Sequence, residues 1–310
     1  MRPLGTALGG APRNSHPNDT RRGLRWRAGV RESRVRGAPR AGTKMLRAEV
    51  NGFSVAYERT GDGPALVLLH GFTHDSRVWR QQLEALADQF TVIAWDAPGA
   101  GQSSDPPETF GIVDWADCLA GFLDAAGVYH ADIIGLSWGG PGPGVLSAPR
   151  RAGAVIGPGR YVRRLEGLAS RTGPRGAPGG LLARCVAAEF VPRYLPGMFG
   201  KSPPQEARDE LARIMTDFHP VGFRLMATAL AYADTRDLLP KIHVPTLLVW
   251  GDADVRSPMT VAHQMRDAIP GARLSVIAGA GHVSNLEEPA QFNAEVREFC
   301  SSVSIQGSRR

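Results

Sequence analysis

The chain has 310 residues, 43% of them hydrophobic, and a net charge of +6, which is enough for one large domain with a buried core. No run of about 18 apolar residues is present, so the sequence predicts no membrane-spanning helix and no membrane partner. The three cysteines, Cys118, Cys185 and Cys300, are too scattered for a disulfide framework or a zinc site. We interpret them as ordinary thiols of a cytoplasmic protein.

The basic charge is concentrated at the N-terminus. Residues 1–44 hold eleven of the 36 Lys and Arg residues and two of the 30 acids, whereas the remainder of the chain carries a charge of −3. No basic patch with interleaved aromatic residues follows residue 45, so we expect no nucleic-acid partner.

Residues 1–44 are rich in Arg, Gly, Pro and Ala and have neither a strand nor a helix period. They lack the apolar stretch of a secretory signal, although an Arg-rich segment with few acids is compatible with an organelle transit peptide. We expect a disordered extension outside the fold, or upstream sequence translated from an early start with Met45 as the functional beginning.

From residue 45 onward, strand patterns alternate with helix patterns. Two short strands are expected around an Asn51-Gly52 hairpin turn. Apolar runs typical of strands buried on both faces occupy 65–69, 91–95, 131–135, 245–250 and 273–277, and helices are expected at about 75–88, 112–126, 259–268 and 289–300. The alternation predicts an α/β fold with a mostly parallel sheet flanked by helices. The domain is expected over 45–302, with a small helical cap at about 171–238 and a tail at 303–310.

Ser137 lies in the sequence Gly135-Leu-Ser-Trp-Gly139, directly after a buried strand. A serine on a sharp strand-to-helix turn needs glycine two positions before and two positions after it, because side chains there would collide. The spacing therefore predicts a nucleophile elbow with Ser137 as the nucleophile.

A serine hydroxyl needs a base, and the base needs an acid that orients it. Of the eight histidines, only His282 follows the end of a predicted strand in the right place, and Asp254 follows another, in the chain order Ser, Asp, His that this fold uses. Parallel strands end at one edge of the sheet, where α/β folds bind ligands. Asp252 competes with Asp254. We choose Asp254 because it lies deeper in the loop, and we expect Asp252 to bond backbone N–H groups in the turn.

Acyl transfer also needs hydrogen-bond donors for the oxyanion of the tetrahedral intermediate. We expect the backbone N–H groups of Trp138, after the nucleophile, and of Phe72, in the loop after the 65–69 strand, to form this oxyanion hole. His70 and His74 lie four residues apart in the same loop but lack a third ligand, so no metal site is expected there. The chemistry needs no cofactor.

The chain from about Met45 to Cys300 resembles the α/β-hydrolase family, specifically its esterase and lactonase branch. The resemblance rests on five elements in order: His70-Gly-Phe72, Asp96-Ala-Pro-Gly-Ala-Gly-Gln-Ser103, Gly135-Leu-Ser-Trp-Gly139, Gly251-Asp-Ala-Asp254 and Gly281-His282. It implies the α/β-hydrolase fold, the acid at Asp254, and structural roles for the Asp96 loop and Glu287. The segment from His282 to Pro289 resembles the same region of 3-oxoadipate enol-lactonases, which implies a small-molecule ester or lactone as substrate, hydrolysed through an acyl-enzyme.

The resemblance leaves alternatives open. The family includes catalytically silent receptors, so a non-catalytic ligand-binding relative or a damaged pseudoenzyme is the second hypothesis. Cofactor-free haloperoxidase-like perhydrolases and hydroxynitrile lyases keep the same triad, whereas Ser137 argues against the branches with an Asp nucleophile. The sequence specifies neither the substrate nor the oligomeric state.

Residues 141–160 depart from the family pattern. Nine of these twenty residues are Gly or Pro, where the fold needs a helix behind the nucleophile, and Pro149 would cost a helix interior about 3 kcal/mol. The strand expected next, at 162–168, is weakened by Glu166 and Gly167. Because this block shares the composition of residues 1–44, we hypothesise a local reading-frame error, which resequencing the coding DNA would test.

Overall fold

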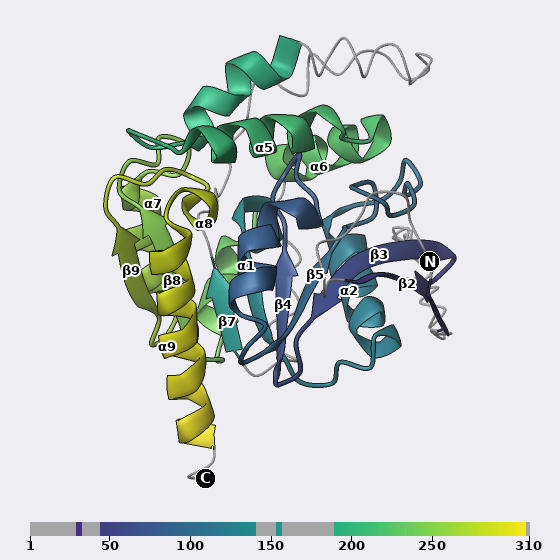
Figure 1. The fold of residues 1–310 in the computed structure, drawn as a ribbon, viewed down its shortest axis with the longest axis horizontal. Coiled ribbons are helices and arrows are strands. Elements are labelled where there is room, and N and C mark those ends of the chain that lie inside the picture. The colour runs from purple at the N-terminus through teal and green to yellow at the C-terminus, as the bar shows by residue number, and fades with distance from the viewer. Residues whose placement is uncertain (1–28, 33–43, 141–152, 157–188, 233, 308–310) are drawn as a thin grey trace, which may run out of the picture.

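A computed structural model describes residues 29–32, 44–140, 153–156, 189–232 and 234–307. They form a mostly parallel sheet with helices on both faces (Figure 1). In sheet order the strands are β1 (Gly29–Glu32), β2 (Lys44–Val50), β3 (Phe53–Thr60), β5 (Thr91–Trp95), β4 (Ala65–Leu69), β6 (Asp132–Gly135), β7 (Gly153–Ile156), β8 (Thr246–Gly251) and β9 (Arg273–Ile277). Pairing is antiparallel from β1 to β5 and parallel from β5 to β9. The predicted α/β-hydrolase fold, with its mostly parallel sheet, is confirmed.

The strands β2 and β3 form the predicted hairpin. Asn51 and Gly52 connect them with φ angles of 51° and 84°, as in a type I′ turn, for which Asn-Gly is a favoured sequence. The register pairs Val50 with Phe53 directly across the turn.

The expectation that all of residues 1–44 lie outside the fold is wrong for Gly29–Glu32. This segment is β1 and pairs antiparallel with β2, and Lys44 already belongs to β2. A physical reason is that β2 would otherwise be an edge strand with a row of unpaired backbone groups. The rest of the expected extension lies outside the described residues.

The helices, with short 3-10 turns labelled η, are η1 (Ser76–Trp79), α1 (Arg80–Ala85), α2 (Ile112–Ala125), η2 (Ser137–Gly139), η5 (Leu195–Met198), α5 (Gln205–Thr216), α6 (Pro220–Tyr232), η6 (Arg236–Lys241), α7 (Met259–Ala268), α8 (Ser284–Glu287) and α9 (Pro289–Gly307). The helix expected at 75–88 begins as the 3-10 turn η1 and ends early. The closing helix runs on through most of the expected tail as far as Gly307, the last described residue. No helix among the described residues is long and apolar enough to cross a membrane.

The central strands are buried on both faces because alternate side chains pack against different helices. Leu66 and Leu68 of β4 belong to a core cluster that includes residues of α1 and α9. Val67 and Leu69 belong to a second cluster, with residues of α2. This two-sided burial is the reason that the strand carries no polar residue.

The strand that follows β6 is formed by other residues than the sequence predicts. It is β7, formed by residues 153–156 inside the Gly- and Pro-rich block, and not by residues 162–168. It pairs in parallel with β6 and β8. The run Ala154-Val-Ile156 is short, apolar and bounded by glycines in the sequence, which suits a central strand of a parallel sheet. The elbow helix expected after Gly140 and the 162–168 segment lie outside the described residues.

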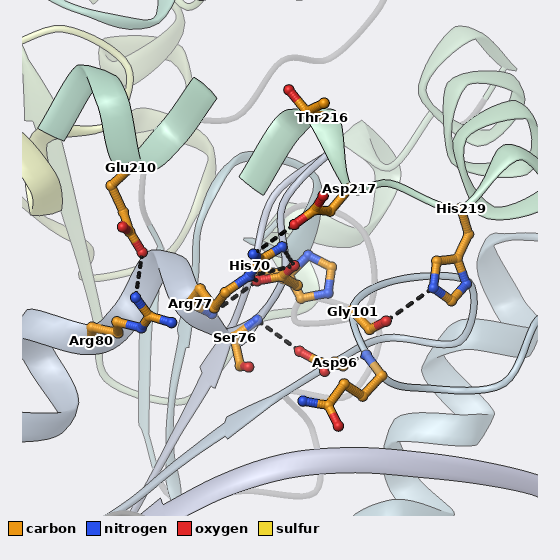
Figure 2. A network of polar contacts seen from close by, with 12 residues as sticks. His70, Ser76, Arg77, Arg80, Asp96, Gly101, Glu210, Thr216, Asp217 and His219 are labelled. Carbon is orange, nitrogen blue, oxygen red and sulfur yellow. Dashed lines mark hydrogen bonds and ion pairs between the residues drawn. The ribbon is translucent and has the colours of Figure 1, made fainter. Parts of the chain in front are cut away.

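The helical insert between β7 and β8 lies across one end of the sheet (Figure 1), where the sequence places the cap. Polar contacts join it to the core, as Figure 2 shows. Arg80 donates to Glu210 of α5 at 2.8 Å, and Arg77 donates to Asp217 at 2.8 Å. In addition, Nε2 of His219 lies 2.9 Å from the carbonyl oxygen of Gly101.

Candidate active site

Ser137 is the first residue of η2, on the sharp turn that follows β6. Its φ is 52°, in the left-handed region that non-glycine residues rarely adopt and that recurs at functional turns. A Cβ on Gly135 would lie 2.4 Å from the backbone of the same turn, and a Cβ on Gly139 would lie 2.6 Å from the carbonyl oxygen of His70. These clashes explain why both positions need glycine.

His282 connects Ser137 to Asp254. Its Nε2 lies 2.9 Å from Oγ of Ser137, and its Nδ1 lies 2.8 Å from Oδ2 of Asp254. His282 is 3% exposed and Asp254 is 4% exposed. Because a carboxylate only accepts hydrogen bonds, Nδ1 carries the proton and Nε2 is left to accept the serine proton. The structure thus brings together the three residues that the sequence singles out.

The two candidate acids differ in their partners. Oδ1 of Asp254 accepts the backbone N–H groups of Arg256 at 2.7 Å and Ser257 at 2.9 Å, which fixes the carboxylate so that Oδ2 faces His282. Asp252 is exposed, and it accepts the backbone N–H of Gly279 at 2.6 Å. That is the turn contact expected of it.

The loop that carries His282 is attached to the cap. The carbonyl oxygen of Met198, at the end of η5, accepts the N–H of His282 at 2.9 Å. Glu287 accepts the N–H of Gly281 with one oxygen and that of Gly200 with the other, both at 2.7 Å. Burial raises the pKa of Glu287, and the two backbone donors oppose this shift. Glu287 therefore has the structural contacts that the family resemblance implies.

Trp138, and the loop that carries Phe72, both lie next to Ser137. Trp138 is the next residue along the chain. Gly71, the residue before Phe72, is packed against Ser137, since a Cβ on Gly71 would lie 3.2 Å from the Cβ of Ser137. Both residues are therefore placed close enough to Ser137 for their N–H groups to be considered as oxyanion donors.

His70 fixes the peptide that carries the Phe72 N–H. Its Nε2 accepts the N–H of Ala97 at 3.0 Å, which leaves Nδ1 protonated to donate to the carbonyl oxygen of Gly71 at 2.8 Å. Burial lowers the pKa of His70, in agreement with a neutral ring. From the sequence, His70 was recognised as the first residue of the His70-Gly-Phe72 element and was rejected as a metal ligand, but no positioning role was expected of it. Its position directly before the glycine of the loop was the available signal for a positioning role.

Aromatic side chains from the cap cover this region. The ring of Phe72 lies 6.2 Å from that of Tyr194 and 5.0 Å from that of Phe223. The guanidinium of Arg256 lies 3.4 Å from the centre of the Tyr194 ring. The surroundings of Phe72 are thus mainly apolar, as in most small-molecule sites.

Comparison with known proteins agrees with the fold and the motifs. Residues 66–295 match the alpha/beta hydrolase family. The chain is 28% identical to 3-oxoadipate enol-lactonase 1 of Acinetobacter baylyi, over 84% of this chain and 94% of the lactonase. It is similar to the structure of a thermophilic esterase from Thermogutta terrifontis, with 28% identity, a TM-score of 0.71, and coverage of 81% of this chain and 94% of the esterase. An enol-lactonase from Burkholderia xenovorans gives 25% identity and a TM-score of 0.73, over 82% and 99% of the two chains. The resemblance that the five sequence elements indicate is confirmed.

Proposed function

The chain belongs to the alpha/beta hydrolase family, and from this premise we propose that it is a serine hydrolase of small carboxylic esters or lactones. The observation that carries the proposal is the continuous hydrogen-bonded series from Ser137 through His282 to Asp254. Both distances are within hydrogen-bond reach, which proton transfer from Ser137 to His282 and orientation of the imidazole by Asp254 each require. The esterase and enol-lactonase relatives support the same substrate class.

In the first half-reaction, Oγ of Ser137 attacks the carbonyl carbon while its proton passes to Nε2 of His282. The carbonyl π electrons move to the oxygen, which the N–H groups of Phe72 and Trp138 stabilise. The electron pair then returns, the ester C–O bond breaks, and the leaving oxygen takes the proton from His282. In a lactone, that oxygen stays attached to the acyl chain.

In the second half-reaction, water attacks the acyl-enzyme while His282 accepts one of its protons. Collapse of this second tetrahedral intermediate breaks the bond to Oγ, returns the proton to Ser137 and releases the acid. Asp254 accepts a hydrogen bond from the protonated Nδ1 throughout, and its negative charge stabilises the imidazolium that forms in each half-reaction.

Two assays test this proposal. One is labelling with a fluorophosphonate, and the other is the hydrolysis of p-nitrophenyl esters of increasing chain length and of simple lactones. We expect wild-type protein to be labelled, and Ser137→Ala to lose the label and at least about a thousandfold in kcat. Ser301→Ala, an exposed position on α9, is the matched control and should keep both. Folded wild-type protein that is neither labelled nor active on any ester or lactone would instead favour a non-catalytic relative.

A further inference from the structure

A second histidine is buried beside Ser137 and has no task in the proposed mechanism. His74 is 3% exposed, and among the described residues neither of its ring nitrogens has a hydrogen-bond partner. Buried polar groups in folded proteins are nearly always paired, so an exception requires an explanation, such as a ligand that completes the site.

His74 lies next to the nucleophile. A Cβ placed on Gly71 would be 3.1 Å from Nδ1 of His74 and 3.2 Å from Cβ of Ser137, so the imidazole and the serine border the same small space. The turn before His74 is strained, because the β-branched Thr73 has a φ of 63°. Such a residue is rare in the left-handed region and persists only where its surroundings enforce it.

His74 also lines a small pocket between the core and the cap. The other walls come mainly from the turn around Gly101 and from Ile214, Phe223 and Met226 in or near the cap helices. These residues make the lining of the pocket largely apolar.

The two other polar side chains that line the pocket are already engaged. The hydroxyl of Thr73 donates to the carbonyl oxygen of Phe72 at 2.6 Å. The carboxylate of Asp75 accepts the backbone and side-chain N–H groups of Arg77. Within the described part of the chain, His74 is therefore the polar side chain of the pocket whose hydrogen-bonding capacity is unused.

The imidazole of His74 is neutral. Burial, and to a smaller extent the neighbouring His70, His282 and Arg256, hold the pKa of His74 well below its usual range. A neutral imidazole offers one donor and one acceptor. A hydroxyl complements this pair fully. A carbonyl and a carboxylate each complement only the donor, but a carboxylate would also place a charge in a largely apolar pocket, which is costly without a cationic partner.

We propose that His74 is a specificity-determining residue that hydrogen-bonds to a neutral oxygen substituent, a hydroxyl or a carbonyl, next to the scissile ester bond of the substrate. The inference rests on the proposed function and narrows its substrate class. The preferred substrate is an ester or lactone with an apolar body and one such oxygen within reach of the imidazole.

Two pairs of esters test the inference. p-Nitrophenyl 3-hydroxybutyrate and p-nitrophenyl butyrate differ by one hydroxyl on the acyl side, and 2-hydroxyethyl butyrate and ethyl butyrate differ by one on the alcohol side. We expect wild-type kcat/KM to favour the hydroxylated member of at least one pair by about tenfold, the effect of one well-placed hydrogen bond.

The readout is this ratio and not the rate, because a merely structural role for His74 would change both members of a pair alike. His74→Leu should reduce the ratio to about one, and His74→Gln should restore part of it, because a carboxamide keeps a donor and an acceptor. His263→Leu, an exposed position on α7, should leave the ratio unchanged. If His74→Leu does not fold, His74→Phe keeps a ring of similar shape and takes its place.

Three results would each overturn the inference. The wild-type protein could show no preference for either hydroxylated ester, or the preference could persist in the variant without the imidazole. The third is a stronger preference for the p-nitrophenyl ester of succinate, whose acyl group ends in a carboxylate. Calorimetric binding of the intact esters to Ser137→Ala separates this inference from the proposed function. Tighter, His74-dependent binding of hydroxylated esters by a protein whose wild type hydrolyses nothing would support the inference alone.

Discussion

Replacing Asp254 by Asn changes one atom of the proposed triad and tests the direction of its hydrogen bonds. The new carboxamide has a single carbonyl oxygen, whereas the carboxylate uses one oxygen for the N–H groups of Arg256 and Ser257 and the other for His282. In one orientation, the carboxamide keeps both backbone bonds and points its NH2 group at Nδ1 of His282. That ring nitrogen must then be unprotonated, so the proton moves to Nε2 and the base is blocked.

The magnitude follows from the cost of the opposite orientation. Turning the carboxamide over would leave two buried N–H donors facing an NH2 group, at about 1–3 kcal/mol each. A total of about 2–6 kcal/mol leaves a few per cent of molecules or fewer with a productive His282, since about 1.4 kcal/mol corresponds to a factor of ten. Loss of the negative charge beside the imidazolium adds to this. We therefore expect kcat to fall by about a hundred- to ten-thousandfold with little change in KM.

The assay is the hydrolysis of p-nitrophenyl butyrate by wild type, Asp254→Asn and Asp252→Asn, with circular dichroism to verify folding. Asp252→Asn is the matched control because its carboxylate is exposed and accepts a turn N–H. The reasoning is refuted if folded Asp254→Asn keeps more than about one tenth of kcat, or if the Asp252 variant loses as much.

Two further predictions concern the loops around the site. Glu287→Gln can accept only one of the N–H groups of Gly281 and Gly200. Its melting temperature should fall by several degrees and its kcat by about tenfold, and a lowered melting temperature with unchanged kcat would show that the contact does not position His282. Burial raises the pKa of Asp96 to about 7. Between about pH 4 and 7, the folded state therefore keeps a proton on Asp96 that the unfolded state has lost. Because the folded state binds more protons, the free energy of unfolding falls as the pH rises toward 7. Thermal denaturation from about pH 5 to 8 should give a steeper decline for wild type than for Asp96→Asn, and equal slopes would contradict this origin.

The strands and the positions of the three proposed triad residues could be predicted because their signals are local. A run such as Thr91–Trp95, buried along its whole length, is recognisable as a strand without knowledge of its neighbours. Asp254 and His282 follow such runs directly, and parallel strands that share an edge bring their ends together whatever the cap does.

The features that the sequence did not predict depend on contacts between distant segments. The strand β7 has only four residues within a Gly- and Pro-rich block, and its strand character comes from β6 and β8 on either side. For β1, pairing with β2 outweighs a composition typical of disorder. His74 was considered only as a metal ligand, because the absence of a partner for its ring is a property of the folded surroundings and cannot be read from spacing.

The hydrogen bonds that join the loop carrying His282 to the cap have a consequence for turnover. The backbone of His282 and the side chain of Glu287 both hold the link between η5 and α5, through Met198 and Gly200. Any displacement of that link must strain or carry the segment that bears the imidazole. A molecule that displaces this link is therefore expected to disturb the position of His282, and to inhibit the proposed hydrolase, without touching Ser137.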